Sequence, residues 1–287
     1  MKICFVIIRW KGGVGTVIKS LKKELESKGH EVFVISREDD LKIFSFKNSL
    51  FKLKKALPEY DVLISMDWSI AIPLLGCKNH YCIFNGLELS SIQQLLQRYV
   101  YFRLKDKIMC VGDHMIYYYP KATAIELGVD LDLFKPKKDN LINSKIIGFL
   151  QTKSDIYSFE KIVEAVNNID GAMLTTTWDS YVPHNEMSSI YNSLDVLVSL
   201  PPVNAGFNLV WLEAMACNTK VIGNNNGVGH KLPIKKLSYN PSVEDIELAI
   251  REQLDIGEPN TRQWIMDNKF TWENTVNKML KVIDNGI

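Results

Sequence analysis

The stretch that decides the fold is Ala205-Gly-Phe-Asn-Leu-Val-Trp-Leu-Glu213-Ala-Met-Ala-Cys-Asn-Thr-Lys-Val-Ile222. Its pattern predicts a phosphate-binding turn, then a helix, then a buried strand. Glycine lets backbone N–H groups approach a ligand, and the N-terminus of a helix favours negative charge. Glu213 lies in the middle of an otherwise apolar helix. Burying an isolated carboxylate costs several kcal/mol, so Glu213 needs a partner, and a ligand hydroxyl would serve.

Outward from this stretch, short β-branched runs alternate with helical patterns along the whole chain, which predicts an α/β fold with parallel sheets. Strands are expected at 2–8, 31–36, 61–66, 80–84 and 107–111, and then at 145–150, 172–177, 195–200 and 219–223. Helices are expected, among others, at 90–105, 243–255 and about 260–284.

The length of 287 residues suits roughly two domains. The charged segment 135–140 is typical of a linker between them. We therefore expect a short N-terminal Rossmann-like domain at 1–135 and a second at 136–260. The last segment, 261–287, is expected to be a C-terminal helix that crosses back toward the first domain.

Composition narrows the class of protein. The net charge of +1 gives no argument for a nucleic-acid partner. Five cysteines are scattered through apolar runs without metal-ligand spacing, as expected of buried free thiols in a reducing compartment. No apolar run reaches the roughly 18 residues that a membrane-spanning helix needs. These features predict a cytoplasmic protein.

A glycine-rich turn, Gly12-Gly13-Val14-Gly15, follows the first buried strand and opens a helix. Such a turn brings backbone N–H groups close to a phosphate or a sugar, although a plain strand-to-helix turn has the same pattern. A nicotinamide-dependent oxidoreductase is a third reading of this turn. The dinucleotide fingerprint would need its third glycine at Ile18, which argues against it.

Two polar positions follow later strands of the first half. Asp67 comes directly after strand 61–66, at the sheet edge where α/β folds bind ligands, and capping the next helix is an equal alternative. Asn85 follows strand 80–84 and is able to hold a sugar hydroxyl, but it cannot act as an acid or base. Asp130 and Asp132 alone make a weak metal site, and we expect no metal.

Taken in order, these motifs resemble the retaining GT-B glycosyltransferases of family 4. The resemblance rests on the glycine turn, Asp67-Trp68, Gly128-Val-Asp130 with Phe134-x-Pro136, Val182-Pro183, the helix of Glu213, and Phe270-x-Trp-Glu273. It spans nearly the whole chain. It implies an α/β, GT-B architecture: two Rossmann-like domains with parallel sheets that face each other across a cleft.

The resemblance also implies roles for particular residues. Gly13, Asp67 and Asn85 would lie on the catalytic, acceptor side. Glu213 would accept hydrogen bonds from the nucleotide ribose. His184 has no Cys, Asp or His at ligand spacing, and we expect it to start a helix rather than to act as a catalyst. The implied donor-binding residues are Gly15, Lys153, Tyr157, Tyr181, Val182, Ala205, Gly206, Phe207, Asn208, Leu209 and Glu213.

The sequence departs from the family pattern within this donor set. Ala205 stands where the family has its first Glu, and Asn208 where it has its second Gly. Phe149 occupies the position of the Arg that neutralises the donor diphosphate. The family's Lys corresponds either to Lys153 or, by another alignment, to Tyr157.

The implied activity is transfer of a hexose from a nucleotide-diphosphate sugar to an acceptor hydroxyl, with retention and without a metal or other cofactor. The acceptor would be a glycan, a lipid-linked molecule or a small molecule. The alternative is a catalytically impaired GT-B module that binds nucleotide or glycan, or partners an active transferase.

Residues 42–57 interleave lysines with apolar residues. Basic amphipathic segments of this kind bind anionic membranes, which would make the protein membrane-peripheral. The ordinary alternative is a segment that faces the core with a solvated basic edge.

Overall fold

The computed structural model describes residues 1–10, 12–43, 48, 52–88, 90–137, 145–150, 158–177, 182–202 and 206–286. The chain divides into two compact units. The first consists of Met1–Leu127 together with Trp272–Ile287, and the second is Gly128–Thr271. The boundaries expected from the sequence are 135 and 260.

In the first unit, the described strands and α-helices are β1 (Lys2–Ile7), α1 (Gly13–Ser27), β2 (Glu31–Ser36), β3 (Val62–Met66), α3 (Trp68–Leu74), β4 (His80–Phe84), α4 (Ser91–Leu104), β5 (Ile108–Cys110), β6 (Thr123–Ala124) and α10 (Trp272–Asp284). Short 3₁₀ helices are η1 (Leu53–Ala56), η2 (Lys105–Lys107) and η3 (Asp113–Tyr117). The strands form a parallel sheet in the order β2-β1-β3-β4-β5-β6.

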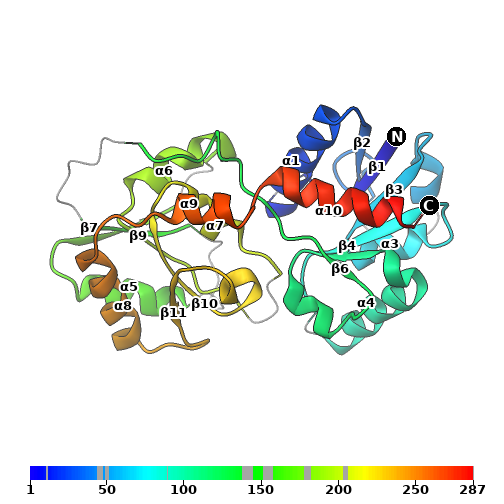
Figure 1. Cartoon of the computed structure of the whole chain (residues 1–287). Helices are drawn as coiled ribbons and strands as arrows, with labels where there is room; N and C mark the ends of the chain where they lie inside the picture. The colour runs from blue at the N-terminus through cyan, green and yellow to red at the C-terminus, as the bar shows by residue number, and fades with distance from the viewer. Residues whose placement is uncertain are drawn as a thin grey trace. The chain divides into compact units, whose positions relative to one another are not determined.

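Helices cover both faces of this sheet. α1 packs against α10, and α3 packs against α4, so the two pairs lie on opposite faces, as right-handed crossovers require. Figure 1 shows the red C-terminal helix α10 beside the blue helix α1. Side chains on β1 alternate between the faces: Cys4 and Val6 belong to the core cluster under α3. A strand buried on both faces explains why β1 is an unbroken apolar run.

In the second unit, the described strands and α-helices are β7 (Lys145–Phe149), α5 (Phe159–Asn167), β8 (Ala172–Thr176), α6 (Met187–Ser193), β9 (Val196–Val198), α7 (Leu209–Ala216), β10 (Lys220–Asn224), β11 (Lys235–Leu237), α8 (Val243–Asp255) and α9 (Thr261–Asp267). The 3₁₀ helices are η5 (His184–Glu186) and η6 (Gly227–His230). This sheet is also parallel, in the order β11-β10-β9-β7-β8.

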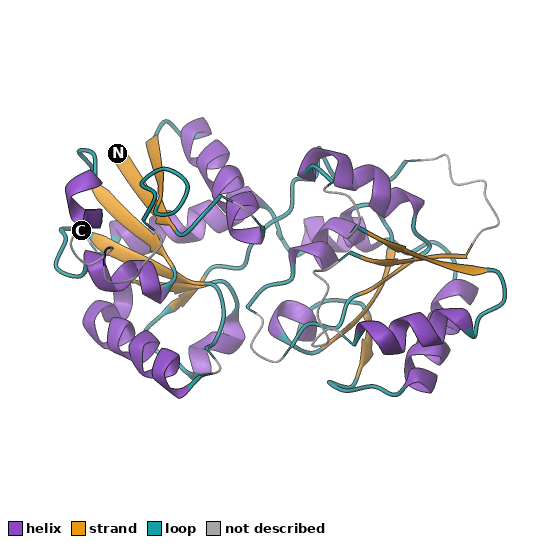
Figure 2. Cartoon of the chain, turned by 180° about the vertical axis from the view of Figure 1, so that it is seen from behind, coloured by secondary structure: helices purple, strands orange, loops and turns teal. Residues whose placement is uncertain are grey.

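Each face of the second sheet has its own hydrophobic cluster. α5 and α8 pack together over one face, against Ile147, Val196 and Ile222. α6, α7 and α9 cover the other face, where Leu197 and Val221 point. Successive strand residues therefore serve opposite clusters, as the pleat of a strand demands. Figure 2 shows purple helices on both sides of the orange strands in each unit, so the parallel α/β fold is confirmed.

The expected single helix at about 260–284 is wrong, because the chain leaves the helical path between α9 and α10. Lys269 has a positive φ of 57°. The Phe270 carbonyl then accepts a hydrogen bond from Val129 N at 3.1 Å, and Thr271 pairs with Val129 in a parallel bridge. Because these backbone groups pair with Val129, they cannot form the hydrogen bonds of a continuous helix, and α9 and α10 are separate helices.

The described part of 42–57 contributes to the core. Ile43 and Leu53 are buried, which favours the ordinary alternative for these two residues. Residues 44–47 and 49–51 lie outside the described residues. All five cysteines are free, and four of them are buried. Among the described helices, none combines the length and apolar character needed to cross a bilayer.

The close approach of Gly15 to the backbone gives a stability prediction. A Cβ built on Gly15 would lie 1.7 Å from the Trp10 carbonyl oxygen, whereas one on Gly13 meets nothing within 4 Å. We expect Gly15→Ala to lower the free energy of unfolding by about 1–3 kcal/mol, since overpacking forces the backbone to shift. Gly13→Ala is the matched control and should not destabilise. Urea denaturation measures both, and equal stability of the two variants would contradict this packing.

Buried His80 gives a pH prediction. Burial is the main cause that lowers its pKa from 6.5 to about 4, and Lys54 and Lys107 add to it. The unfolded chain therefore binds the proton at a higher pH than the folded protein does. The contribution of neutral His80 to the stability of the folded protein is therefore complete above pH 6.5, and it is lost as the pH falls toward 4. It amounts to about 3 kcal/mol of unfolding free energy.

His80→Gln should flatten this pH dependence. Denaturation curves recorded across this pH range provide the measurement. An identical pH dependence in His80→Gln and the wild type would refute the assignment.

Candidate functional site

The turn before α7 lies at the carboxyl end of β9. Gly206 is buried, and Asn208 is the N-cap residue of α7 with φ −106° and ψ 91°. This extended conformation requires no glycine, so Asn208 replaces the family's Gly without backbone strain. The Asn208 side chain donates to Ser199 Oγ at 2.7 Å, and Trp211 Nε1 donates to the Ser199 carbonyl at 3.2 Å. These bonds hold the N-terminus of α7 against the strand end.

The Glu213 carboxylate is buried on α7 and already has partners within the chain. Tyr191 OH donates to Oε2 at 2.7 Å, and His184 Nε2 lies 2.8 Å from Oε1. The partner that the sequence demanded is thus provided by α6 and η5 rather than by a ligand alone. Each carboxylate oxygen has two acceptor positions, so a further hydrogen bond to Glu213 remains available.

Aromatic rings surround this carboxylate. Phe134 makes edge contacts with the His184 ring at 5.3 Å and the Tyr191 ring at 5.8 Å between centroids. Burial, and then the charge of Glu213, raises the pKa of Tyr191 well above 10. Tyr191 is therefore a neutral hydrogen-bond donor to the Glu213 carboxylate.

Residues 130–134 form a turn that is fixed by hydrogen bonds. The Asp130 carboxylate accepts from the backbone N–H groups of Asp132 and Leu133, both at 3.1 Å. Arg262 on α9 donates to the carbonyls of Leu131 and Phe134. Within the described ranges, no three His, Cys, Asp or Glu side chains are grouped as metal ligands.

Several implied donor residues do not meet in the described structure. Phe149, at the family's Arg position, points into the core beneath α5 and contacts the Phe159 ring. Lys153, Tyr157, Tyr181 and Ala205 lie outside the described residues. Gly206, Phe207, Asn208 and Leu209 lead directly into the helix of Glu213, and Val182 is two residues before His184.

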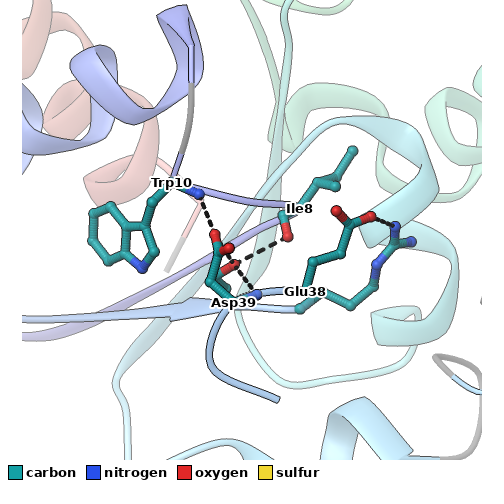
Figure 3. A network of polar contacts seen from close by, with 6 residues as sticks. Ile8, Trp10, Glu38 and Asp39 are labelled. Atoms are coloured by element: carbon teal, nitrogen blue, oxygen red, sulfur yellow. Dashed lines mark hydrogen bonds and ion pairs between the residues drawn. The ribbon is translucent and has the colours of Figure 1, made fainter. Parts of the chain in front are cut away.

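In the first unit, a polar network ties the end of β1 to the end of β2 (Figure 3). Trp10 N donates to Asp39 Oδ2 at 2.6 Å. Ser36 Oγ donates to the Ile8 carbonyl at 3.0 Å and accepts from Asp39 N at 3.0 Å. The network fixes the entry to the glycine turn, where Gly13 begins α1 and Gly15 touches the Trp10 backbone.

Residues 37–39, which follow β2, make contacts within the chain. Arg37 is buried at the end of β2, and its Nη2 donates to Glu38 Oε1 at 2.8 Å. Asp39 is held by Trp10, as described above. No described residue hydrogen-bonds the buried Arg37 Nε. Glu38 is thus paired with Arg37 within the chain.

Asp67 has the backbone of a strained position. Its φ of 95° is rare for a residue other than glycine, and such strain is typical of functional sites. The side chain caps α3 by accepting from Ser69 N at 2.9 Å, as the capping alternative predicts. Burial is the main cause that raises the pKa of Asp67, and Glu88 acts in the same direction.

The loop 85–88 after β4 is positioned by the inner face of α4. Gln97 is buried there and donates to the Gly86 carbonyl at 2.9 Å while it accepts from Glu88 N at 3.3 Å. Glu88 Oε1 in turn accepts from Trp68 Nε1 at 2.6 Å. Asn85 is half-buried at the start of this loop. Carboxylates beside indole rings are suited to bind hydroxyl-bearing ligands.

Sequence reasoning missed four residues that shape these sites. Arg37 and Glu88 each follow a buried parallel strand, and the rule that selected Asp67 would have selected Arg37 as well. Tyr191 and His184, the partners of Glu213, carry no comparable signal. They are 22 and 29 residues away in the sequence, and only the packing of α6 and η5 on α7 brings them together.

No protein-family model and no curated protein sequence matches this chain. Several solved structures do match it. A sucrose-phosphate synthase from Thermosynechococcus elongatus matches with a TM-score of 0.75 and 16% identity, over 99% of this chain and 98% of that one. Anabaena HepE in complex with UDP has a TM-score of 0.76 and 12% identity, over 99% and 100% of the chains. A glycosyltransferase from Rickettsia africae has a TM-score of 0.72 and 16% identity, over 99% and 98%.

These matches extend over the full length of both units. At such low identity they establish the fold and leave the chemistry to the residues. The chain has the two-domain, Rossmann-like α/β fold of the GT-B glycosyltransferases.

Proposed function

We propose that the protein is a glycosyltransferase that moves a hexose from a nucleotide-diphosphate sugar to an acceptor hydroxyl. The observation that carries the proposal is the buried, hydrogen-bonded Glu213 on a helix that follows a tight turn at the carboxyl end of a strand. Ligands bind at this edge of open α/β sheets. The same fold holds UDP and UDP-glucose in the Anabaena neighbour.

On the donor side, we assign ribose recognition to Glu213. Tyr191 and His184 hold the carboxylate in place by hydrogen bonds, so it is oriented to accept a ribose hydroxyl. Backbone N–H groups of Gly206 to Leu209, at the start of α7, bind the phosphate and the sugar, because the helix N-terminus favours negative charge. We assign the contact with the base to Val182 and Tyr181.

The chemistry that fits this site is retaining and independent of metal. The bond between the anomeric carbon and the diphosphate oxygen breaks, and the acceptor oxygen bonds to the same face of the sugar. The acceptor proton passes to the leaving phosphate, so no protein base is needed. Lys153 supplies positive charge for the diphosphate, since stabilising the developing charge is usually the largest catalytic contribution.

On the acceptor side, we assign Gly13, Asp67 and Asn85. The strained, buried carboxyl of Asp67 accepts a hydrogen bond from an acceptor hydroxyl, and Asn85 holds a second one. A polar edge that also carries Trp68 and Glu88 suits a glycan, including a glycan carried on a lipid or a small molecule.

A second candidate is a GT-B module that binds a nucleotide or a glycan without transfer, or that partners an active transferase. Phe149 favours it, because a buried ring in the core replaces the family's Arg and removes one cation from the diphosphate. Turnover of a panel of radiolabelled nucleotide sugars separates the two candidates. Binding without transfer or hydrolysis would select the module.

The donor assignment predicts nucleotide affinity. We expect UDP or GDP to bind the wild type in isothermal titration calorimetry. Glu213→Gln should weaken that binding about tenfold, since it removes a charge-assisted hydrogen bond to the ribose. Glu160→Gln, at an exposed position on α5, is the matched control and should bind like the wild type. If neither nucleotide nor any nucleotide sugar binds the wild type, the proposal fails.

The acceptor assignment predicts a split between folding and transfer. Asn caps helices as well as Asp does and tolerates positive φ, so Asp67→Asn should keep the stability and nucleotide affinity of the wild type. Transfer to the acceptor should fall by about tenfold or more, because the carboxylate is lost. Steady-state kinetics with a fixed donor measure this. Unchanged transfer by Asp67→Asn would leave Asp67 with its capping role alone.

A further inference from the structure

Helix α4 carries an apolar stripe on its outer surface. Ile92, Leu95, Tyr99 and Phe102 are 74%, 67%, 44% and 69% exposed. Their spacing of three, four and three residues places them on one side of the helix. Single exposed apolar residues are ordinary, but a row of four large ones along one helix marks an interaction surface. α4 packs against α3 and β4 in the first unit (Figure 1).

The orientation of this stripe is fixed by the inner face of the helix. Gln97 and Val100 are buried, and Gln97 is hydrogen-bonded to the loop 85–88 and to Tyr119 OH. Tyr101 OH accepts from Lys121 N at 3.1 Å, which attaches the last turn of the helix. A rotation that hid the stripe would break these contacts, so the apolar side chains remain on the surface.

The charged residues on α4 itself are all basic. α4 contains Arg98 and Arg103 and no acidic residue. The Arg103 guanidinium lies over the Tyr99 ring at 6.0 Å, and Lys105 Nζ lies over the Phe102 ring at 5.8 Å. Cations that flank exposed aromatic rings are the arrangement by which amphipathic helices meet a lipid surface, with rings inserted and charges at the headgroups.

A basic hollow adjoins the C-terminal end of α4. It has a volume of about 440 Å³, and four lysines line it: Lys107, Lys121, Lys278 and Lys281. The Lys278 ammonium pairs with Glu126 at 2.5 Å, and Asp106 also lines the hollow. Lys121 connects the hollow to the helix through the bond to Tyr101 OH. A concave surface with excess positive charge attracts anions.

We propose that the outer face of α4 docks on an anionic lipid bilayer. Ile92, Leu95, Tyr99 and Phe102 enter the headgroup region, and Arg98, Arg103 and the lysines of the hollow contact the lipid phosphates. A second copy of the chain docked face to face would bring these arginines against each other. This inference goes beyond the proposed function, because docking requires no nucleotide sugar and is tested without one.

The experiment is cosedimentation of the full chain with sucrose-loaded vesicles. Vesicles of phosphatidylcholine alone are compared with vesicles of phosphatidylcholine and phosphatidylglycerol. We expect binding to the anionic vesicles only, and it should weaken at high salt. Phe102→Asn should lower the partition coefficient about tenfold, since a large apolar side chain no longer inserts. Arg98→Gln should lower it about fivefold, the typical contribution of one cation at an anionic surface.

Matched controls place the effect on α4. Leu248→Asn changes a residue on α8 that is 59% exposed, and Lys19→Gln removes an exposed cation from α1; both should bind like the wild type. Thermal unfolding of every variant verifies that it folds.

Four outcomes would overturn the proposal. They are no binding to anionic vesicles, equal binding to neutral vesicles, α4 variants that bind like the wild type, and a dimer in sedimentation equilibrium that Phe102→Asn dissociates. The last would assign the stripe to a second copy of the chain.

Discussion

Parallel strands buried on both faces are the constraint on which this molecule depends. Helices cover both faces of each sheet. A polar side chain at a strand position such as Val6 or Leu197 would therefore be buried away from water. Polar function is therefore displaced to the strand ends, where the chain turns toward the next helix. The network around Asp39, the strained Asp67, the loop of Glu88 and the turn at Asn208 all follow a strand. The two units share this logic without sharing a sequence.

Glu213 illustrates the opposite case, a charge that stays in the interior. Tyr191 and His184 come from segments that precede β9 in the sequence, and Glu213 comes from the helix that follows β9. The carboxylate therefore connects the segments before and after this strand. Removing one partner of a buried charge costs more than the bond itself contributes, because the charge remains buried. The network thus holds α6, α7 and η5 together, and any ligand at Glu213 meets a carboxylate that is already oriented.

Much of the architecture was predictable because strand burial leaves a direct mark on the sequence. The runs 31–36 and 80–84 coincide with β2 and β4, and 243–255 coincides with α8. The break between α9 and α10 was not predictable, since it depends on Val129, which is far away in the sequence. Within the site, Glu213 was recognisable as a buried charge in an apolar helix. Its partners, the burial of Phe149 and the buried Arg37 were not, because they arise from packing between elements.

The first unit is discontinuous in sequence: it needs α10, which follows the whole of the second unit. α10 packs on α1, Thr275 Oγ1 donates to the Glu126 carbonyl, and Tyr81 OH donates to the Ile283 carbonyl. During synthesis, residues 128–271 emerge as one uninterrupted segment and have all of their own sheet before α10 exists. The first unit therefore begins to be synthesised first, but its fold is completed after that of the second unit. Until α10 is synthesised, the side of the first unit that carries α1 remains accessible to chaperones and to neighbouring chains.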